Sequence, residues 1–565
     1  MSSAALPRTH LDLSGLLFAG LALVLSALVL LPLGWLAWFG VTDKGGAVTL
    51  GNFATLVADP SFVAPFVTTL AVALAVSVLS CLVATPLAWL VGRTDMPGRR
   101  LVRLLVMASF VTPPFLGAIA WEILAAPNSG LLNQWYRTVF DLEPDAHLLD
   151  IYTVEGLVFV MACYAFPYVF VLAANALERI PADLEDASAI LGGSRWHGFR
   201  RVTLPLLLPS LLAGALVAFL QAMTQFGAPA ILALPAGFHV ITTRIWSLFQ
   251  YPPEPHLAAA ASLPLLLLTA LLLRGQQWAL EGRGYAVIAG KSGAPGRVAL
   301  GRWRWVVLVG ALAVLALPVL LPYAALLRTA LVPTASEPLT WNALTLHNFR
   351  FVFEEFSATR LALANTLILG LVSATAGSAL ALVTAFLAAR RVIAGARFLG
   401  FLATAPAAIP GIVLGVGLFL AYTRPPFVLY GTLAILLLAF VTIELPAAYQ
   451  QLRSALASLH PELEEASRIL GASRARALWQ ITAPLLGSSV VATWCFIFIG
   501  AIRELSATIM LTTADTKLVS VIIYDLNESG DLGAIAVLGI ALLVITFVVV
   551  AVANSLSRRR GDPAP

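Results

Sequence analysis

Charge is scarce in this sequence. Charged residues make up 11% of its 565 residues and hydrophobic residues make up 60%, whereas about 25% of the residues in a soluble domain are charged. Lys44, Lys291 and Lys517 are the only lysines. A water-soluble enzyme of this size needs a more polar exterior than these residues supply. The net charge of +5 is too small to indicate a nucleic-acid partner, and we expect none.

Cysteine and histidine are also scarce. Cys81, Cys163 and Cys495 lie far apart in apolar runs, and none has a Cys or His at the spacing of metal ligands. The seven histidines are scattered as well. We therefore expect no metal site, no disulfide and no catalytic residues on this chain.

Long apolar runs dominate the sequence instead. A membrane-spanning helix needs about 20 mostly apolar residues, and Pro113 and Pro410 fall within two such runs, where we expect packing kinks. Twelve runs are long enough, and they cover residues 14–40, 65–92, 102–124, 154–177, 203–225 and 256–274, then 305–327, 361–389, 398–422, 426–449, 483–502 and 532–554. The sequence predicts an all-α polytopic membrane protein with about twelve transmembrane helices.

Arginine clusters indicate how the chain crosses the lipid bilayer. If the N-terminus is cytoplasmic, 25 of the 34 basic residues fall on the cytoplasmic side, as the positive-inside rule requires. These include the clusters at residues 93–103, 179–201 and 390–397. An even number of spans also places residues 558–560 inside. We expect both termini to be cytoplasmic.

The two halves of the chain repeat each other. Residues 182–205 and 461–484 align without gaps at an offset of 279, with 11 of 24 positions identical. Around the second and eighth spans the offset is 297, so the first half carries an insertion at about 125–153. We expect two parallel six-helix repeats, at residues 1–275 and 303–565, joined by a cytoplasmic linker at 276–302.

Each repeated block lies in a cytoplasmic loop between the fourth and fifth spans of its half, at residues 178–205 and 451–484. Acidic residues open a short helix, where the helix dipole favours them, and Gly192 or Gly471 stands at the position of a C-terminal cap. Such a loop can rest on the bilayer surface or dock into another protein. Two copies at a fixed offset favour docking.

These blocks resemble the EAA loop of ABC-importer permeases, in which Glu-Ala-Ala is followed by three residues and a glycine. The triplets here read Asp186-Ala187-Ser188 and Glu465-Ala466-Ser467. The resemblance implies a type I ABC-importer permease fold, in which the two loops form coupling helices for two ATPase subunits. It assigns the coupling role to Glu185, Asp186, Ala187, Ser188, Gly192, Glu464, Glu465, Ala466, Ser467 and Gly471.

The same resemblance implies the partners and the location. Two copies of an ABC ATPase would bind ATP and Mg, so this chain would need no cofactor and would be no enzyme itself. A periplasmic substrate-binding protein would dock on the far side, where residues 125–153 and 504–530 are the expected contact loops. The membrane would be a bacterial inner membrane.

One stretch resembles an ATP-binding motif. Residues 284–292 resemble a Walker A loop, but five residues separate Gly284 from Gly290 where that motif has four. The sequence also offers no soluble domain of sufficient size for a nucleotide-binding fold. We interpret the stretch as a turn in the linker.

The transported solute is indicated only by resemblance. The stretches Arg503-Glu504-Leu505-Ser506, Gly227-Ala228-Pro229 and Gly290-Lys291 are most similar to fused ferric-iron permeases, which implies ferric iron as the substrate. Thiamine, phosphonate and polyamine are the alternative substrates. A twelve-span secondary transporter is a further alternative, but its signature is expected between spans two and three, where this chain has a short loop.

Polar residues inside the spans are candidates for the solute pathway, because such residues are costly in a bilayer. The end of the eleventh span matches the end of the fifth, and polar side chains stand at both. Glu444 lies deeper, in the tenth span. The candidates are Gln221, Thr224, Gln225, Glu444, Arg503 and Glu504. An ion pair between Arg503 and Glu504 that only ends the span is an equally open interpretation.

Overall fold

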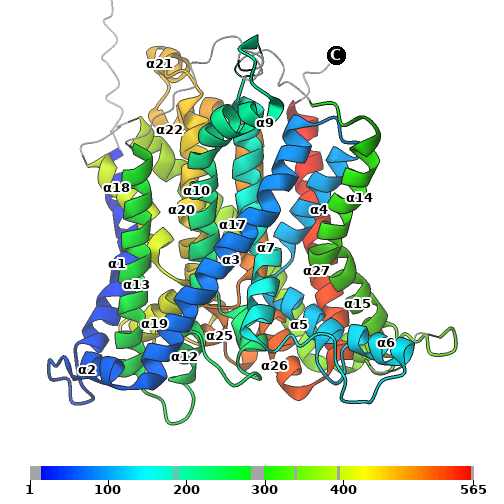
Figure 1. The fold of residues 1–565 in the computed structure, drawn as a ribbon. Coiled ribbons are helices and arrows are strands. Elements are labelled where there is room, and N and C mark those ends of the chain that lie inside the picture. The colour runs from blue at the N-terminus through cyan, green and yellow to red at the C-terminus, as the bar shows by residue number, and fades with distance from the viewer. Residues whose placement is uncertain are drawn as a thin grey trace, which may run out of the picture.

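The computed structural model describes residues 14–181, 184, 188, 190–281, 298–335, 337, 340–390 and 395–561. In these residues the chain is a bundle of helices (Figure 1). Extended pairing within them is limited to two isolated bridges, Thr42 with Val48 and Thr94 with Val298. The stretch 284–292 lies outside the described residues.

Within its described residues the first half contains twelve α-helices and one π-helical turn. They are α1 (Ser14–Gly40), α2 (Gly51–Ala58), α3 (Pro60–Arg93), α4 (Arg99–Val111), α5 (Pro114–Ala125), α6 (Leu131–Phe140), α7 (Val154–Arg179), α9 (Arg195–Gly198), η1 (Phe199–Thr203), α10 (Leu204–Thr224), α11 (Gly227–Leu232), α12 (Ile241–Ser247) and α13 (Pro255–Glu281).

The second half repeats this order. It contains η2 (Gly301–Trp303), α14 (Arg304–Leu315), η3 (Ala316–Leu320), α15 (Leu321–Ala330), α16 (His347–Arg350), η4 (Phe351–Glu355), α17 (Ser357–Ala389), α18 (Ala396–Thr404), η5 (Ala405–Ala408), α19 (Gly411–Tyr422), α20 (Leu433–Ala457), α21 (Glu462–Ile469), α22 (Arg474–Ala477), η6 (Leu478–Thr482), α23 (Ala483–Leu485), α24 (Gly487–Arg503), α25 (Thr508–Leu511), η7 (Ala514–Thr516), α26 (Val519–Ser529) and α27 (Leu532–Gly561).

The described helices confirm a polytopic all-α protein. Nine of them are long and apolar enough to cross a membrane, and the number rises to twelve if each of three bent pairs is one span. The third, ninth and eleventh spans are bent by 100°, 113° and 76°, and the first two of these bends fall at Pro113 and Pro410, where the sequence predicts kinks. Pro113 and Pro410 stand at the first two bends in extended conformation. Proline lacks the N–H that would continue the helix, so each helix stops there and restarts in a new direction.

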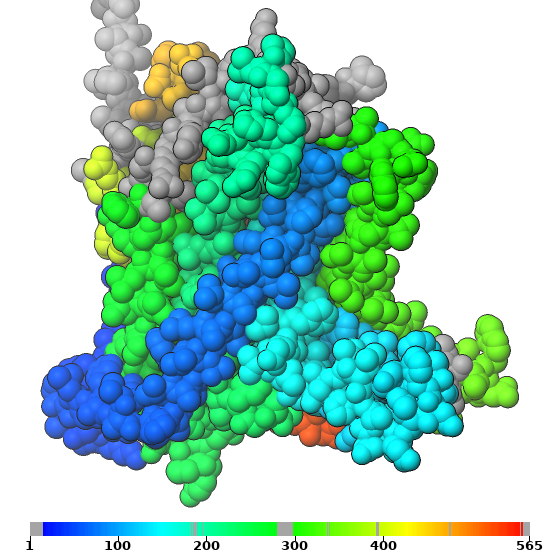
Figure 2. Space-filling view, viewed as in Figure 1, coloured from blue at the N-terminus to red at the C-terminus, as the bar shows by residue number. Residues whose placement is uncertain are grey.

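The internal duplication is visible element by element. At an offset of 279, α9 and η1 correspond to α22 and η6, and α7 corresponds to α20. At an offset of 297, α5 corresponds to α19 and α3 to α17. The inserted residues of the first half contain α6, which projects from one end of the molecule (Figure 2).

The first helix of each half packs against the other half. Helix α1 lies against α18 and α19, and α15 lies against α5. A tyrosine hydroxyl joins each pair: Tyr422 of α19 donates to the carbonyl of Ala27 at 3.0 Å, and Tyr323 of α15 lies 2.7 Å from the hydroxyl of Thr112. The two halves are therefore interlocked rather than set side by side.

Each half has a core of three helices, α3 with α7 and α10, and α17 with α20 and α24. Small residues allow their close approach, as membrane helices require. A Cβ on Gly214 would lie 2.9 Å from the backbone of Val169, and one on Gly370 would lie 2.9 Å from the Phe498 ring.

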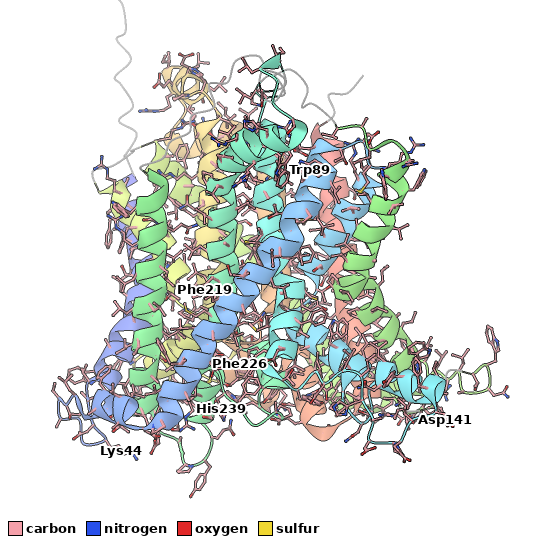
Figure 3. All side chains as sticks on the ribbon, in the orientation of Figure 1. Lys44, Trp89, Asp141, Phe219, Phe226 and His239 are labelled. Atoms are coloured by element: carbon pink, nitrogen blue, oxygen red, sulfur yellow. The ribbon has the colours of Figure 1, made fainter. Side chains whose placement is uncertain are left out.

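The bundle has two distinct ends. Helices α9, α21 and α22 lie together at one end, which we call the loop face; α2, α6, α12 and α26 lie at the other, the opposite face (Figure 1). Trp89 lies near the loop face, whereas Lys44, Asp141 and His239 lie at the opposite face (Figure 3).

Candidate functional site

The two repeated loops lie on the same face of the molecule and have the same local structure. Gly471 follows α21 with a φ of +91°, and Gly192 has a φ of +83° in the first loop. Only glycine adopts this left-handed conformation readily, so Gly471 caps α21 as predicted, whereas most of the segment before Gly192 lies outside the described residues. After each glycine a serine hydroxyl caps the next helix, since Ser194 accepts from the N–H of His197 and Ser473 from that of Arg476.

Each loop exposes a pair of large apolar side chains beside its glycine. Ile190 and Leu191 are 85% and 88% exposed, and their repeat mates Ile469 and Leu470 are 85% and 89% exposed. Burying such a side chain stabilises a protein by about 1.5–3 kcal/mol. Two matching apolar pairs on one face are therefore typical of a surface that another protein covers.

The other predicted coupling residues differ in exposure. Glu465 and Ala466 are exposed, Ser467 and Ser188 are half-buried, and Glu464 is buried. Glu185, Asp186 and Ala187 lie outside the described residues.

Glu464 makes two hydrogen bonds and a salt bridge inside the chain. Its Oε1 accepts from Nε of Arg390 at the end of α17 and from the hydroxyl of Thr482, each at 3.1 Å, and Nη2 of Arg390 lies 3.0 Å from the same oxygen. Arg390 also donates to the carbonyl of Leu459. A buried carboxylate needs such partners. Both partners are repeated in the sequence, since Arg390 matches Arg93 and Glu464 matches Glu185. The two matches have different offsets, however, so the sequence does not indicate that the two side chains pair.

Several predicted pathway residues meet between the halves. Gln221 and Gln225 of the first half and Arg503 of the second line one small pocket, together with Tyr168 of α7. Gln221 donates to the hydroxyl of Tyr168 at 3.3 Å, and the guanidinium of Arg503 lies 5.1 Å from the centre of the Phe110 ring. Sequence reasoning missed Tyr168 because a lone tyrosine in an apolar span carries no signal of its own.

Polar atoms in this pocket lack protein partners. Among the described residues, neither Nε of Arg503 nor Oε1 of Gln225 has one, and both atoms are buried. Buried polar atoms are normally paired, and the pocket has room for a water molecule that could bond to these atoms. Thr224 does not share this property, because its hydroxyl bonds to the Leu220 carbonyl of its own helix.

Glu444 and Glu504 lie near this pocket in different settings. The Glu444 carboxylate packs against Gly500 of α24, where a Cβ would lie only 2.0 Å from its Oε1. Glu504 Oε1 accepts from the N–H of Ala507 at 2.8 Å and so caps the segment that leads into α25. Arg503 and Glu504, both within the described part, form no ion pair with each other.

Aromatic side chains of the two halves meet in one cluster. Phe226, Trp246 and Tyr524 form one cluster with ring centres 5.9–6.3 Å apart. Gly227 lies beside them, and a Cβ there would be 3.4 Å from Leu505 of the other half. The halves thus touch directly beyond the polar pocket.

The described residues contain no group of three or more His, Cys, Asp or Glu side chains that could hold a metal ion. Cys81, Cys163 and Cys495 are free thiols.

Comparison with known proteins gives two matches to one family model. The model for the binding-protein-dependent transport system inner membrane component matches residues 84–281 and 377–562. A ferric transport system permease protein of Actinobacillus pleuropneumoniae is 27% identical over 456 residues, 78% of this chain and 63% of that protein. A putative ferric permease of Haemophilus influenzae is 27% identical over 413 residues. This chain spans 63% of the length of each of these two relatives.

Two further likenesses cover about half of the chain. A sulfate transport system permease protein of Escherichia coli is 28% identical over 275 residues, which are 48% of this chain and 92% of that protein. A solved bacterial ABC transporter for alginate import is 18% identical with a TM-score of 0.40, and the match covers 48% of this chain and 98% of the solved chain.

Proposed function

Because the chain belongs to the family of binding-protein-dependent transport system inner membrane components, we propose that it forms the whole solute pathway of one ATP-driven importer. In this proposal the two repeat loops dock two copies of an ABC ATPase, which bind ATP and Mg. The chain moves solute by exposing the space between its halves alternately to each side.

The observation that carries this proposal is the pair of matching loops on one face. Their exposed apolar pairs, Ile190 with Leu191 and Ile469 with Leu470, are repeat mates, so two identical partners can bind them in the same way. The loop face also holds the arginine-rich loops, which favours a cytoplasmic position for it and for both termini. ATPases in a bacterial cytoplasm would have access to this face.

The opposite face would then receive a periplasmic binding protein. Helix α6 of the insertion projects there, and Trp135 and Phe140 on it are each 59% exposed (Figure 2). Helix α26, from the expected contact loop 504–530, lies on the same face. Aromatic residues are favoured in protein interfaces because they bury a large area with few rotatable bonds.

Ferric iron delivered by that binding protein is the proposed cargo. Its support is that two relatives named as ferric permeases each align with more than 70% of this chain. An oxyanion is a second candidate, favoured by the sulfate permease relative and by the Arg503 guanidinium in the pocket between the halves. A guanidinium group suits an anion better than a bare cation.

The cargo test is uptake into cells that lack the chain. Cells would be supplied with radiolabelled ferric iron, sulfate or thiamine, with and without the restored gene. The proposal expects restored iron uptake that stops when ATP is depleted. Unchanged iron uptake removes the iron assignment, and uptake that follows a proton gradient without ATP would favour a secondary transporter.

The coupling test changes the exposed apolar pairs. Ile469→Asp with Leu470→Asp should leave the isolated chain as stable as before, because these side chains have few contacts within it. The same change should remove ATPase binding at that loop, measured by co-purification. Val57→Asp, at an exposed apolar residue of α2 on the opposite face, is the matched control.

A further inference from the structure

Three segments meet at one buried carboxylate on the loop face. Arg390 at the end of α17, Glu464 of α21 and Thr482 of η6 are joined through Glu464 Oε1 at 3.0–3.1 Å. The Arg390 and Glu464 side chains are 16% and 12% exposed. A charge-assisted hydrogen bond from Nε of a planar guanidinium, together with the ion pair through Nη2, fixes direction as well as distance. The contact therefore holds α21 in one orientation relative to α17.

We propose that Arg390 and Glu464 are positioning residues that make α21 and α17 move as one body. In this role Glu464 transmits movement within the chain and does not itself contact the ATPase; the exposed Glu465 beside it remains free for that contact. The inference rests on the proposed coupling function, and it names the route by which a displacement of the loop is transmitted to the pathway residues.

The other end of α17 is tied to the opposite face. Asn365 donates to the carbonyls of Asp515 and Lys517 at 3.2 and 3.1 Å. Thr366 accepts from the N–H of Val519 at 3.0 Å. A helix of 33 residues thus bonds to the repeat loop at one end and to the segment after Glu504 at the other.

Tight packing along α17 keeps it in register with the pathway helix. Gly370 and Gly377 face Phe498 and Ile497 of α24, and added Cβ atoms would approach those side chains to 2.9 and 3.1 Å. Interfaces packed this closely move as discrete units rather than deform gradually. A rotation of α17 would therefore carry α24, which ends in Arg503.

The first half has matching residues at both ends of α3. Thr69, the mate of Thr366, accepts from the N–H of Ile241 at 2.8 Å on the opposite face. At the loop face Arg93 and Thr203, the mates of Arg390 and Thr482, are each 1% exposed. The mate of Glu464 is Glu185, which lies outside the described residues. The duplication has kept the Arg, Glu and Thr of the loop face and the Thr of the opposite face, whereas Thr68 stands at the position of Asn365.

Distance measurement between spin labels tests the proposal directly. The full chain, with its three cysteines replaced by alanine and bound to its ATPase, would carry labels at Ala389 of α17 and Glu462 of α21. Both positions are exposed. We expect the same distance without nucleotide and after trapping with ATP and vanadate. A second pair, at Trp196 and Glu462, should change between these states because it joins the two loops.

The outcomes distinguish failure of the proposed function from failure of the rigid connection between α17 and α21. If the chain binds no ATPase or the Trp196–Glu462 distance never changes, the proposed function fails. If that distance changes and the Ala389–Glu462 distance changes with it, the rigid connection is overturned while the proposed function stands.

A variant distinguishes transmission from a merely structural role. Labels at Arg360 and Tyr251, both exposed on the opposite face, should report a nucleotide-dependent shift in the parent chain. Glu464→Gln should retain ATPase binding and lose this shift, whereas Arg397→Gln, at an exposed arginine of α18, should keep it. Retention of the full shift in Glu464→Gln, or loss of its ATPase binding, contradicts the proposal. If Glu464→Gln does not fold, Arg390→Lys, which keeps the charge but not the paired donors, takes its place with the same expectation.

Discussion

At the scale of single residues, each half places one polar side chain in the middle of the bundle, but the two side chains come from helices that are not repeat mates. In the first half Gln221 on α10 projects toward Tyr168, and α7 carries only Ala165 opposite it. In the second half Glu444 on α20 projects instead, and the repeat mate of Gln221 on α24 is Gly500, whose missing side chain leaves room for the carboxylate. The sequence repeat pairs Glu444 with Ala165; the compensating glycine becomes evident only from the packing.

Gly500→Ala should destabilise the chain, because the new Cβ would meet the Glu444 carboxylate at 2.0 Å. Overpacking of this kind costs about 1–3 kcal/mol. The measurement is thermal unfolding of the purified chain in detergent. Adding Glu444→Ala should restore most of the loss, and a double variant as unstable as Gly500→Ala would show that the carboxylate is not the obstacle.

Arg503→Gln should reduce transport while leaving the fold intact, because it removes the only guanidinium that lines the described pocket between the halves. We expect uptake to fall by about tenfold or more, the scale of losing a charge-assisted contact of ~1.5–3 kcal/mol. Uptake of the cargo into vesicles, with ATPase binding measured in parallel, is the readout. Arg360→Gln, at an exposed arginine of α17, is the control, and equal uptake by both variants would exclude Arg503 from the pathway.

At the scale of elements, the helix caps and the π-helical turns are repeated more faithfully than the side chains around them. Both loops end their first helix at a glycine of positive φ, and both place a five-residue π-helical turn, η1 or η6, before the next span. The glycine caps could be predicted because a left-handed residue has a clear sequence preference. The π-helical turns could not, since they depend on how the loop docks on the bundle.

Replacing both cap glycines by leucine should have a small effect on the stability of the chain and a large effect on ATPase binding. Among the described residues no heavy atom lies within 4 Å of a Cβ added at Gly471 or Gly192, so the Cβ of the new side chain meets no clash there. The left-handed backbone costs a non-glycine residue about 1–2 kcal/mol at each site. We expect a modestly less stable chain that no longer binds its ATPase, as measured by unfolding and by co-purification. Normal ATPase binding by a folded double variant would rule out a close docked partner at these caps.

At the scale of the whole molecule, interlocking is what makes two similar halves one transporter. Helix α1 packs on α18 and α19 across the interface, and α15 packs on α5. Contacts between spans distant in sequence cannot be read from periodicity, so the sequence predicted two parallel repeats but not the exchange of their first helices. The kinks at Pro113 and Pro410 could be predicted, but their angles of 100° and 113° could not, because a proline in an apolar run signals a kink without fixing its angle.

A chain divided within the linker tests this interlocking. Residues 1–289 and 290–565 expressed together should co-purify in detergent, because each half buries a helix of the other. A tag on one fragment and detection of the other is the measurement. As a control, the first fragment should lose its partner when residues 1–50, which include α1, are removed; fragments that associate equally well without α1 would show that the exchange is dispensable.

The most direct test of the whole account is the mass of the intact complex released from detergent or nanodiscs. One chain with twin docking loops should carry two ATPase subunits, and the change at Ile469 and Leu470 should reduce that number to one. A complex with a single ATPase in the parent chain, or with none, would contradict the claim that both loops are built to receive the same partner.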